Sequence, residues 1–544
     1  MAFFEDVSKL SSVHPKPPGL NLEYGTAGFR ANAGQLDHVM FRMGLLAALR
    51  SKQTKATNGV MVTASHNPEE DNGVKVVDPM GEMVAPAWEG YATRLANAEQ
   101  RELISVLEDI VEKEDIDWSQ EASVFVGKDT RSSSASLSQA VLDGVSSLRG
   151  RSKDYGLVTT PQLHYMVCCH NTQGRYGEAS VEGYYVKLCQ AFIELTKNTP
   201  NRTDDQKHLT VDGANGIGAL KVREMEHHLK RELQISLFNE GHGKLNHQCG
   251  ADFVKVQQKP PTGVKVRSGE RCCSFDGDAD RIVYYYTDSD GRFHLLDGDK
   301  IATLISTFLK ELFMQAGLNL KIAVVQTAYA NGSSTRYLED TVKVIVRCTK
   351  TGVKHLHHAA QEFDTAVYFE ANGHGTVLFS SAAEEKIKRL AEDVGADDGR
   401  KRAAILLQHT INVINQTVGD AISDMLLIEA ILALKGMTVQ QWDAIYTDLP
   451  NRQIKVKVSD RRVIGTTDAE RRAVSPPGLQ DAIDASVGKY RLARSFVRPS
   501  GTEDVVRVYA EADTQESADS LAHEVSLAVY RLAGGLGEEP KPLH

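Results

Sequence analysis

Short apolar runs alternate with longer amphipathic stretches along most of the chain. Six strand-like runs end in small or polar turns, at residues 59–65, 122–129, 208–216, 321–329, 342–348 and 365–373. Between them lie segments with apolar residues at helical spacing, such as 135–148 and 299–317. This order predicts α/β layers with mostly parallel strands, in which ligands collect at the carboxyl ends of the strands.

Three breaks in this pattern divide the chain. A polar stretch at 196–208 precedes a new strand, a hairpin at 284–296 leads into the long helix, and a helix-rich region gives way to short strands near 445–458. A length of 544 residues is enough for several domains of about 150 residues each. We expect α/β domains with mixed sheets at 1–195, 196–298 and 299–447, and a C-terminal α+β domain at 448–544.

Composition and charge exclude several classes of protein. Hydrophobic residues make up 41% of the chain and charged residues 25%, as is usual for a soluble globular protein. The net charge of −10 disfavours general nucleic-acid binding but is compatible with a small phosphate held by a local basic cluster. The seven cysteines form no CxxC spacing, no apolar run reaches about 18 residues, and the acidic start is unlike a signal peptide. We expect a cytoplasmic protein with reduced thiols and no membrane partner.

The segment SFDGDADR places three carboxylates at alternate positions after an apolar approach. Asp276, Asp278 and Asp280 would repel one another unless a cation lay between them, and oxygen ligands of this kind suit Mg²⁺. An EF-hand does not fit, because Arg281 stands where that loop needs glycine and Thr287 where it needs glutamate. We predict a magnesium site, with a solvated acidic turn as the alternative. Arg281 is expected to pair with the acids, to contact a phosphate, or to do both.

The segment RPSGTED at 498–504 has the features of an anion-binding loop. Glycine allows the backbone to approach a ligand closely, and hydroxyls and arginine forks suit phosphate. The residues expected to bind phosphate are Arg498, Ser500, Gly501, Thr502 and Arg507. The alternative is an ordinary capped turn.

Other polar turns carry weaker signals. In FEANGHG at 369–375, Glu370, Asn372 and His374 could hold the vicinal hydroxyls of a sugar, and a polar hairpin is equally consistent with them. The glycines of VDGANGIGA at 211–219 lack the dinucleotide-binding spacing. Basic residues on small-residue turns, either solvated or directed at a phosphate, are Arg30, Lys128 and Arg131.

Ser65 ends the apolar run 59–65. No GxSxG elbow surrounds it, and the side chain of His66, its neighbour, points the other way in an extended chain, so an esterase-type triad is not expected. The same chain carries a predicted metal site, basic turns and a separate phosphate loop. We therefore predict that Ser65 carries a phosphoryl group, which the cation stabilises during transfer.

Four motifs occur in a characteristic order: TASHNP at 63–68, DGDADR at 276–281, EANGHG at 370–375 and RPSGTED at 498–504, preceded by GTAGFR at 25–30. Together they resemble the α-D-phosphohexomutase superfamily over nearly the whole chain. The NGHG form of the third motif is most similar to the eukaryotic phosphoacetylglucosamine mutases, because other branches typically carry Glu-x-Ser-Gly-His. Asn372 in place of that serine favours an N-acetylated sugar.

The resemblance implies a four-domain fold around a central cleft and reversible conversion of N-acetylglucosamine 6-phosphate to the 1-phosphate, in UDP-N-acetylglucosamine biosynthesis. The reaction would pass through phosphoserine at Ser65 and a hexose 1,6-bisphosphate that is both intermediate and primer. Implied Mg²⁺ ligands are Ser65, Asp276, Asp278 and Asp280. Implied catalytic residues are Ser65, His66, Lys128, Arg30 and Arg281. Implied substrate-binding residues are Glu370, Asn372, Gly373, His374, Lys354 and Arg131. We expect a monomer that binds small sugar phosphates.

Three alternatives stay open. A haloacid-dehalogenase-type enzyme would need the motif DxDx(T/V), which ends in threonine or valine. If the motif began at Asp276 its last residue would be Asp280, and if it began at Asp278 its last residue would be Ile282, so neither register fits. A non-catalytic sugar-phosphate sensor would bind without turnover, and the presence of Ser65 with all three aspartates argues against it. Within the mutase interpretation, the other candidate substrates are glucose, mannose and glucosamine phosphates.

Overall fold

The structure is a computed structural model that describes residues 4–199, 202–501 and 503–543. The chain divides into two units. The first unit comprises Met1–Gly298, Asn372–Val377 and Leu390–Val439, and the second comprises Asp299–Ala371, Leu378–Arg389 and Gln440–His544. Within the described residues, none of the helices is both long and apolar enough to span a bilayer.

The N-terminal sheet of the first unit has five strands in the order β1-β3-β2-β4-β5. Its strands are β1 (Phe29–Asn32), β2 (Asn58–Val62), β3 (Asp71–Val77), β4 (Ser123–Lys128) and β5 (Arg151–Leu157). The sheet is mixed, because β2 is parallel to β4 and antiparallel to β3. The runs expected at 59–65 and 122–129 therefore form strands β2 and β4.

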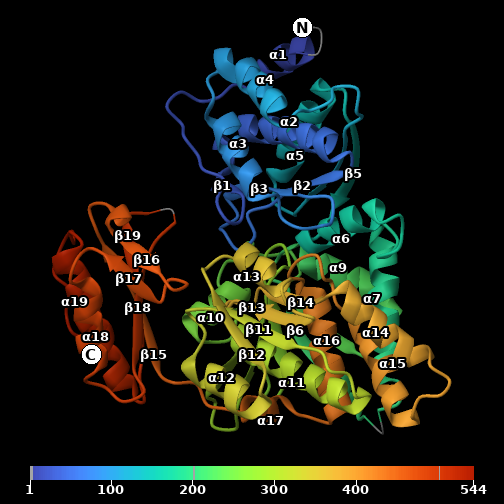
Figure 1. The fold of residues 1–544 in the computed structure, drawn as a ribbon, viewed down its shortest axis with the longest axis vertical. Helices are drawn as coiled ribbons and strands as arrows, with labels where there is room; N and C mark the ends of the chain where they lie inside the picture. Colours follow the sequence, from blue (N-terminus) through green and yellow to red (C-terminus); the bar gives the residue numbers. More distant parts are fainter. Residues whose placement is uncertain (1–3, 200–201, 502, 544) are drawn as a thin grey trace. The chain divides into compact units, whose positions relative to one another are not determined.

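Helices cover both faces of this sheet. They are α1 (Glu5–Ser11), α2 (Asp37–Thr54), α3 (Pro86–Asn97), α4 (Leu103–Lys113), α5 (Ser134–Ser147) and α6 (Thr160–Asn171). In Figure 1, α2, α3 and α5 lie on one side of the sheet and α6 on the other. Helices α2 and α5 approach each other closely through Gly44 and Gly144. A Cβ atom on either glycine would lie 2.2 Å or less from a carbonyl oxygen of the opposite helix.

The second sheet of the first unit has the order β10-β9-β8-β6-β7. Its strands are β6 (His208–Asp212), β7 (Gln234–Phe238), β8 (Cys272–Phe275), β9 (Ile282–Thr287) and β10 (Phe293–Leu296). Strand β6 is parallel to β7 and β8, whereas β8, β9 and β10 form an antiparallel meander. The hairpin expected at 284–296 is confirmed. The remaining helices of this unit are α7 (Val181–Thr196), α8 (Asp204–Lys207), α9 (Ile217–Met225), α10 (Ala251–Gln257), α15 (Asp398–Val413) and α16 (Ala421–Lys435).

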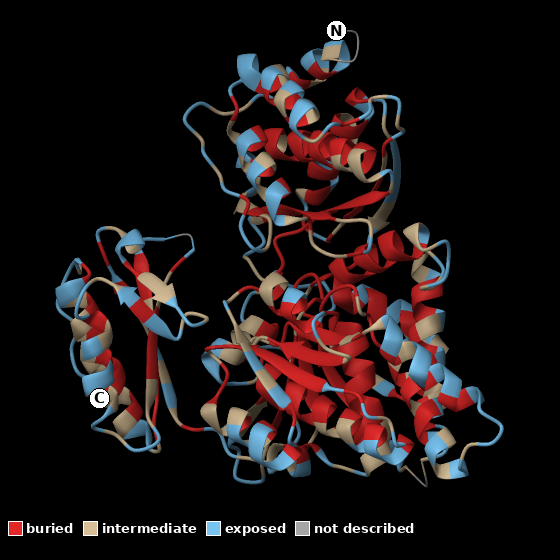
Figure 2. Ribbon diagram, in the orientation of Figure 1, coloured by how far each residue is buried: buried red, intermediate tan, exposed pale blue. Residues whose placement is uncertain are grey.

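The third sheet has the order β12-β11-β13-β14 and belongs to the second unit except for residues 375–377 of β14, which are assigned to the first. Its strands are β11 (Ile322–Thr327), β12 (Ile345–Thr349), β13 (Thr365–Phe369) and β14 (Gly375–Phe379). Its helices are α11 (Gly298–Ala316), α12 (Gly332–Arg336), α13 (Val353–Ala360), α14 (Ser381–Glu392) and α17 (Val439–Asp443). The strand expected at 342–348 starts later, at Ile345, because a π-helical turn occupies Tyr337–Val342 and Lys343 has a left-handed φ of 61°. Figure 2 shows β11 and β13 fully buried.

The C-terminal domain is α+β, as predicted. It contains β15 (Asn451–Lys457), β16 (Gly465–Thr467), β17 (Arg472–Ser475), β18 (Arg494–Pro499), β19 (Val505–Glu511), α18 (Leu479–Val487) and α19 (Gln515–Leu532). Strands β15, β19 and β18 form an antiparallel sheet, and α19 buries its apolar side against β15 and β19. The core includes Val506 from the sheet and Leu521 and Val525 from the helix, all 0% exposed. The domain boundaries expected from the sequence stay a prediction.

Candidate active site

Ser65 lies in the loop that follows β2, at the carboxyl end of that strand. All five residues of β2 are buried, and Ser65 itself is only 1% exposed. Its φ of 50° places the backbone in the left-handed region, which a non-glycine residue seldom occupies. Its amide donates to Thr63 Oγ1 at 3.1 Å, and Thr63 in turn donates to Asp129 Oδ2 at 2.7 Å. A strained, buried serine held by its surroundings points to a functional loop.

The acidic residues lie in the tight turn between β8 and β9. Asp276 and Asp278 are 0% exposed and Asp280 is 5% exposed. Asp276 Oδ1 accepts the amides of Asp280 and Arg281 at 3.0 and 3.2 Å, which closes the turn. Gly277 is required by close approach, because a Cβ atom there would lie 2.4 Å from the carbonyl oxygen of Ser65.

The serine and the acidic turn meet, although 213 positions separate Ser65 from Asp278. Ser65 Oγ donates to Asp278 Oδ2 at 3.0 Å. Both residues belong to the first unit, so the contact lies within one described body. The fold therefore brings the hydroxyl of Ser65 beside a carboxylate of the acidic turn, and the role of these residues as joint Mg²⁺ ligands stays a prediction.

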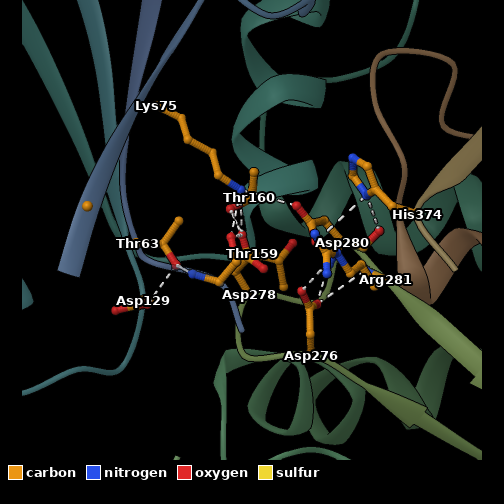
Figure 3. A network of polar contacts seen from close by, with 12 residues as sticks. Thr63, Lys75, Asp129, Thr159, Thr160, Asp276, Asp278, Asp280, Arg281 and His374 are labelled. Atoms are coloured by element: carbon orange, nitrogen blue, oxygen red, sulfur yellow. Dashed lines mark hydrogen bonds and ion pairs between the residues drawn. The ribbon is translucent and has the colours of Figure 1, made fainter. Parts of the chain in front are cut away.

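A lysine absent from the sequence prediction completes this contact (Figure 3). Lys75 comes from β3, and its Nζ donates to Ser65 Oγ at 2.9 Å, to Asp278 Oδ2 at 2.9 Å and to Asp280 Oδ2 at 3.1 Å. Burial alone would lower the Lys75 pKa, but the attraction of Asp278 and Asp280 outweighs it and raises that pKa. The ammonium group is therefore charged, and it neutralises part of the carboxylate cluster.

The carboxylates are not equivalent. Burial and the charges of Asp280 and Asp278 raise the pKa of Asp276 well above its usual range. Burial would also raise the pKa of Asp280, but Lys75 and His374 bring it well below its usual range. The turn thus combines a carboxylate that is readily protonated with one that stays ionised.

The same turn fits a divalent cation. One oxygen from each of the three aspartates lies within 4.8 Å of the others. Asp276 Oδ2, Asp278 Oδ1 and Asp280 Oδ1 are buried, and no group in the described parts of the chain donates a hydrogen bond to them. Buried carboxylate oxygens are costly without a partner, and three that converge suit a hard ion such as Mg²⁺.

Two further groups approach the serine and the acids. Thr160, at the start of α6, donates through Oγ1 to Asp278 Oδ2 at 2.6 Å. Arg30 donates through Nη2 to Ser65 Oγ at 3.2 Å and through Nη1 to Asn67 Oδ1 at 3.4 Å. Ser65 Oγ therefore lies among one carboxylate, one ammonium group and one guanidinium group. That environment stabilises negative charge at the serine oxygen.

The predicted sugar loop is divided between the two units. His374 belongs to the first unit, and its Nδ1 donates to the Asp280 carbonyl at 2.7 Å (Figure 3). Gly373 has a φ of 90°, and a Cβ atom there would lie 1.9 Å from the carbonyl oxygen of Ile282. Asn372 Oδ1 accepts the His374 amide at 3.0 Å. Glu370, like Lys354 at the start of α13, belongs to the second unit.

The other basic residues expected near the reacting centre occupy different environments. Arg131 is buried, forms an ion pair with Asp129, and donates through Nη2 to the carbonyls of Ser65 and Asn67 at 3.3 and 2.8 Å. Lys128 Nζ lies 4.0 Å from a carboxylate oxygen of Asp154. The roles expected of Arg131 and Lys128 stay predictions.

His66 and Arg281 lie beside the acidic turn. Burial, followed by the charges of Arg281 and Arg30, lowers the pKa of His66 well below its usual value, so the ring is neutral. Arg281 Nε lies 4.0 Å from Asp276 Oδ2. The ion pair expected of Arg281 is thus present at long range, and its phosphate contact stays a prediction.

The predicted phosphate loop joins β18 to β19. Arg498 and Arg507 are directly opposite in the antiparallel register of these strands, so two positive side chains flank the loop. The Ser500 amide donates to the Val505 carbonyl at 2.9 Å, and the Gly501 carbonyl accepts from Arg461 Nη2 at 3.1 Å. Thr502 lies outside the described residues.

A counter-ion comes from the neighbouring hairpin of the same unit. Arg498 Nε lies 3.2 Å from Glu470 Oε2, and Glu470 also accepts the Thr351 hydroxyl at 2.8 Å. Opposed like charges destabilise a sheet, and Glu470 offsets the charge of Arg498. The phosphate-binding role expected of Arg498 and Arg507 stays a prediction.

Four family models match the chain in order. They are described as phosphoglucomutase/phosphomannomutase, alpha/beta/alpha domain I, at residues 44–102 and 88–176; phosphoacetylglucosamine mutase AMG1, domain II, at 177–283; its domain III, at 297–437; and phosphoglucomutase/phosphomannomutase, C-terminal domain, at 454–528. The phosphoacetylglucosamine mutase of Homo sapiens is 69% identical over 98% of this chain and 99% of its own length. The chain belongs to the phosphoacetylglucosamine mutase family.

Solved structures of this family have the same fold. Aspergillus fumigatus N-acetylphosphoglucosamine mutase in complex with GlcNAc-6P and magnesium is 48% identical, with a TM-score of 0.93 over 98% of this chain and 99% of that one. A serine-to-alanine variant of that enzyme in complex with glucose 1,6-bisphosphate is 47% identical, with a TM-score of 0.92 over 98% and 99% of the two chains. The four-domain phosphohexomutase architecture and the assignment to the isomerases are confirmed.

Sequence reasoning missed residues of this phosphoacetylglucosamine mutase site that lie outside its motifs. Lys75 interrupts the valine-rich strand β3, and a lysine at a buried strand position was a signal that could have found it. Thr160 precedes a proline at a helix start, which is an ordinary capping pattern and points to no ligand. Only the folded chain brings these two side chains to Asp278.

Proposed function

We propose that this member of the phosphoacetylglucosamine mutase family interconverts N-acetylglucosamine 6-phosphate and N-acetylglucosamine 1-phosphate, supplying the precursor of UDP-N-acetylglucosamine. Phosphorylated Ser65 gives its phosphoryl group to the free hydroxyl of the sugar, and the resulting 1,6-bisphosphate returns its other phosphate to Ser65. The observation that carries this proposal is the buried Ser65 hydroxyl, 3.0 Å from Asp278 Oδ2 and 2.9 Å from Lys75 Nζ.

The side chains around Ser65 Oγ have complementary tasks. Arg30 Nη2 and Lys75 Nζ, at 3.2 and 2.9 Å, place positive charge where the phosphoryl oxygens develop charge. Lys75 is also near enough to give Oγ a proton when the phosphoryl group leaves, and to recover it when the group returns. His66 or Lys128 would take the proton of the attacking sugar hydroxyl and return it to the sugar oxygen that loses its phosphate in the second transfer. Asp278, with Thr160 bonded to the same oxygen, orients the hydroxyl before the return step.

Mg²⁺ would be held by Asp276, Asp278 and Asp280 together with a phosphate oxygen on Ser65, and when bound it supplies neutralisation of the transferring phosphoryl charge. The three buried carboxylate oxygens that accept no hydrogen bond from any described residue support this ligand set. Arg281, directly after the acids, would contact the phosphoryl group from the same turn.

Specificity is proposed to reside in the sugar loop. The sugar hydroxyls would be held by Asn372, His374 and Glu370. Gly373 would allow this loop to pack closely against β9. Lys354 would face the ligand. Arg498, Ser500, Gly501, Thr502 and Arg507 would bind the phosphate that is not transferred. Asn372 in place of the serine of other branches supports the preference for the N-acetylated substrate.

The test is turnover by Ser65→Ala. We expect loss of all detectable conversion of N-acetylglucosamine 6-phosphate, measured by the appearance of the 1-phosphate in the presence of Mg²⁺ and a bisphosphate primer. Binding of the sugar phosphate, measured by calorimetry, should persist because the distal phosphate loop is untouched. Conversion by the purified variant would refute the phosphoserine mechanism.

A substrate comparison tests specificity separately. Glucose, mannose, glucosamine and N-acetylglucosamine phosphates are supplied to the wild-type protein, and the highest kcat/KM is expected for the acetylated sugar. Preference for an unacetylated hexose would overturn the substrate proposal alone. Binding of all four without turnover would favour the sugar-phosphate sensor. The cytoplasmic location and the monomeric state expected from the sequence stay predictions.

A further inference from the structure

The side chain of Asn246 contacts the segment Ser65–Asn67, which we call the serine loop. Asn246 lies in the segment between β7 and α10, far from any of the motifs. Its Nδ2 donates to the carbonyl oxygen of Ser65 at 2.8 Å and to the carbonyl oxygen of Asn67 at 3.0 Å. Both contacts lie within the first unit.

The loop that presents Asn246 is held independently of these two bonds. The Asn246 amide donates to the Ala214 carbonyl at 3.0 Å, and Asn246 has a left-handed φ of 55°. Asn215 Oδ1 accepts the amides of Gly241 and Gly243 at 3.0 and 3.2 Å. The amide group of Asn246 is therefore presented by a loop with its own supports, and truncating the side chain removes the two donations while those supports remain.

Asn246 shares its two acceptors with Arg131. Arg131 Nη2 donates to the same carbonyls of Ser65 and Asn67, at 3.3 and 2.8 Å, from the opposite sheet. Two donors from the regions of two different sheets thus clamp one three-residue segment. The segment needs this clamp, because Ser65 has a left-handed backbone and so cannot continue the ladder of β2.

We infer that Asn246 is a positioning residue for phosphoryl transfer, which acts through the Ser65 carbonyl to hold Ser65 Oγ against Asp278 and Lys75. The inference rests on the proposed role of Ser65 as the phosphoryl carrier. Transfer requires the accepting and leaving oxygens in line with phosphorus, and a displacement of about 1 Å can lower a rate by about 100-fold. Asn246 bonds the main-chain carbonyl of Ser65 and not its hydroxyl, so we expect it to act on the rate of transfer and to leave substrate affinity alone.

The experiment compares Asn246→Asp and Asn246→Ala with Lys244→Ala. Aspartate keeps the shape of the side chain but cannot donate to a carbonyl when ionised. Lys244 lies in the same loop and forms an exposed ion pair with Glu70, which comes from the region of the other sheet, so its removal controls for a general loosening between the two sheet regions. We expect kcat to fall by about 10- to 100-fold in both Asn246 variants, with KM within about threefold of wild type, and Lys244→Ala to behave as wild type.

A second measurement follows the serine directly. Intact mass of the protein after mixing with glucose 1,6-bisphosphate reports phosphorylation of Ser65, and it should be slowed in the Asn246 variants by the same factor as kcat. If Asn246 had only a structural role, its variants would yield less folded protein, but the folded fraction would not combine a lower kcat with a nearly unchanged KM. Wild-type kcat in Asn246→Asp, or a rise in KM as large as the fall in kcat, would overturn the inference.

The proposed function and the positioning role of Asn246 can be refuted separately. If Ser65→Ala retains turnover, the phosphoserine mechanism fails first. If Ser65→Ala is inactive while Asn246→Asp phosphorylates and turns over at the wild-type rate, only the positioning role of Asn246 is refuted.

Discussion

Replacing Lys75 by methionine tests whether its ammonium group holds the acidic turn together. Lys75 Nζ lies 2.9 Å from Asp278 and 3.1 Å from Asp280, and the three side chains are 11%, 0% and 7% exposed. Methionine keeps an unbranched apolar chain and removes the charge. Removing one partner of a buried ion pair costs about 3–5 kcal/mol, because the remaining charge is left buried and uncompensated.

The assay is amide hydrogen exchange of the acidic turn in the presence of EDTA. The amides of Asp280 and Arg281 both donate to Asp276 Oδ1, so their exchange reports opening of the turn. A loss of about 3–5 kcal/mol in the free energy of opening accelerates exchange by about 150- to 5,000-fold. Added Mg²⁺ should slow exchange more in the variant than in wild type, because the cation replaces the missing positive charge.

Lys128→Met is the matched control. Lys128 is also a strand lysine, but its Nζ lies 4.0 Å from Asp154, and the two side chains are 20% and 39% exposed. A pair of this kind contributes less than about 1 kcal/mol. If the acidic turn of Lys75→Met exchanges no faster than that of Lys128→Met, or if Mg²⁺ protects both variants equally, compensation of the carboxylates by Lys75 is refuted.

Three further predictions concern His164, Gly373 and Arg498. Burial lowers the pKa of His164 to about 4 in the folded protein, whereas the pKa in the unfolded chain is about 6.5. As the pH falls from about 6.5 toward 4, the unfolded chain binds a proton that the folded protein does not, so the free energy of unfolding decreases. At pH 5 this lowers the free energy of unfolding by about 2 kcal/mol. Between pH 8 and 5, the free energy measured by urea unfolding should therefore fall by about 2 kcal/mol less in His164→Asn than in wild type, and an equal fall in both proteins would contradict the pKa shift. Gly373→Ala should lower kcat by about 100-fold, because its Cβ would meet backbone at 1.9 Å, whereas Gly90→Ala, with nothing within 4 Å, should be silent in the same assay. If Arg498 binds phosphate, Arg498→Ala should raise KM by about 10- to 150-fold. The Arg462 side chain is 85% exposed, and Arg462→Ala should leave KM unchanged; equal KM values in the two variants would refute the phosphate-binding role of Arg498.

Local signals in the sequence predicted most of the framework of the site. The apolar run ending at Ser65 and the turn after β8 were both recognisable, because a buried strand followed by small and polar residues has few alternative structures. The expected strand at 342–348 was wrong in its first residues. Its alternating apolar and polar residues also suit the end of a helical turn, and the structure places a π-helical turn at Tyr337–Val342.

The environment of each charged side chain could not be predicted in this way. Arg131 lies on a small-residue turn that suggests a ligand contact, yet its side chain is 0% exposed and serves backbone carbonyls. Lys75 and Asn246 have no motif around them. The carboxylate partner Asp278 of Lys75 and the carbonyl partner Ser65 of Asn246 lie 203 and 181 positions away along the chain, so neither neighbouring residues nor periodicity carries information about these two contacts.

By itself, the sequence determined which residues are candidates for the chemistry: a serine after a buried strand, three alternating carboxylates, a glycine-bearing loop expected to hold the sugar and an arginine-flanked loop expected to hold an anion. These are properties of adjacent residues and of local backbone freedom. The tertiary structure alone decided that Lys75 is the cation shared by Ser65 and the acids, and that Asn246 and Arg131 clamp the serine loop. The physical reason is that the energy of a buried charge or hydrogen bond depends on the partner in space, and that partner is supplied only when distant strands pack together.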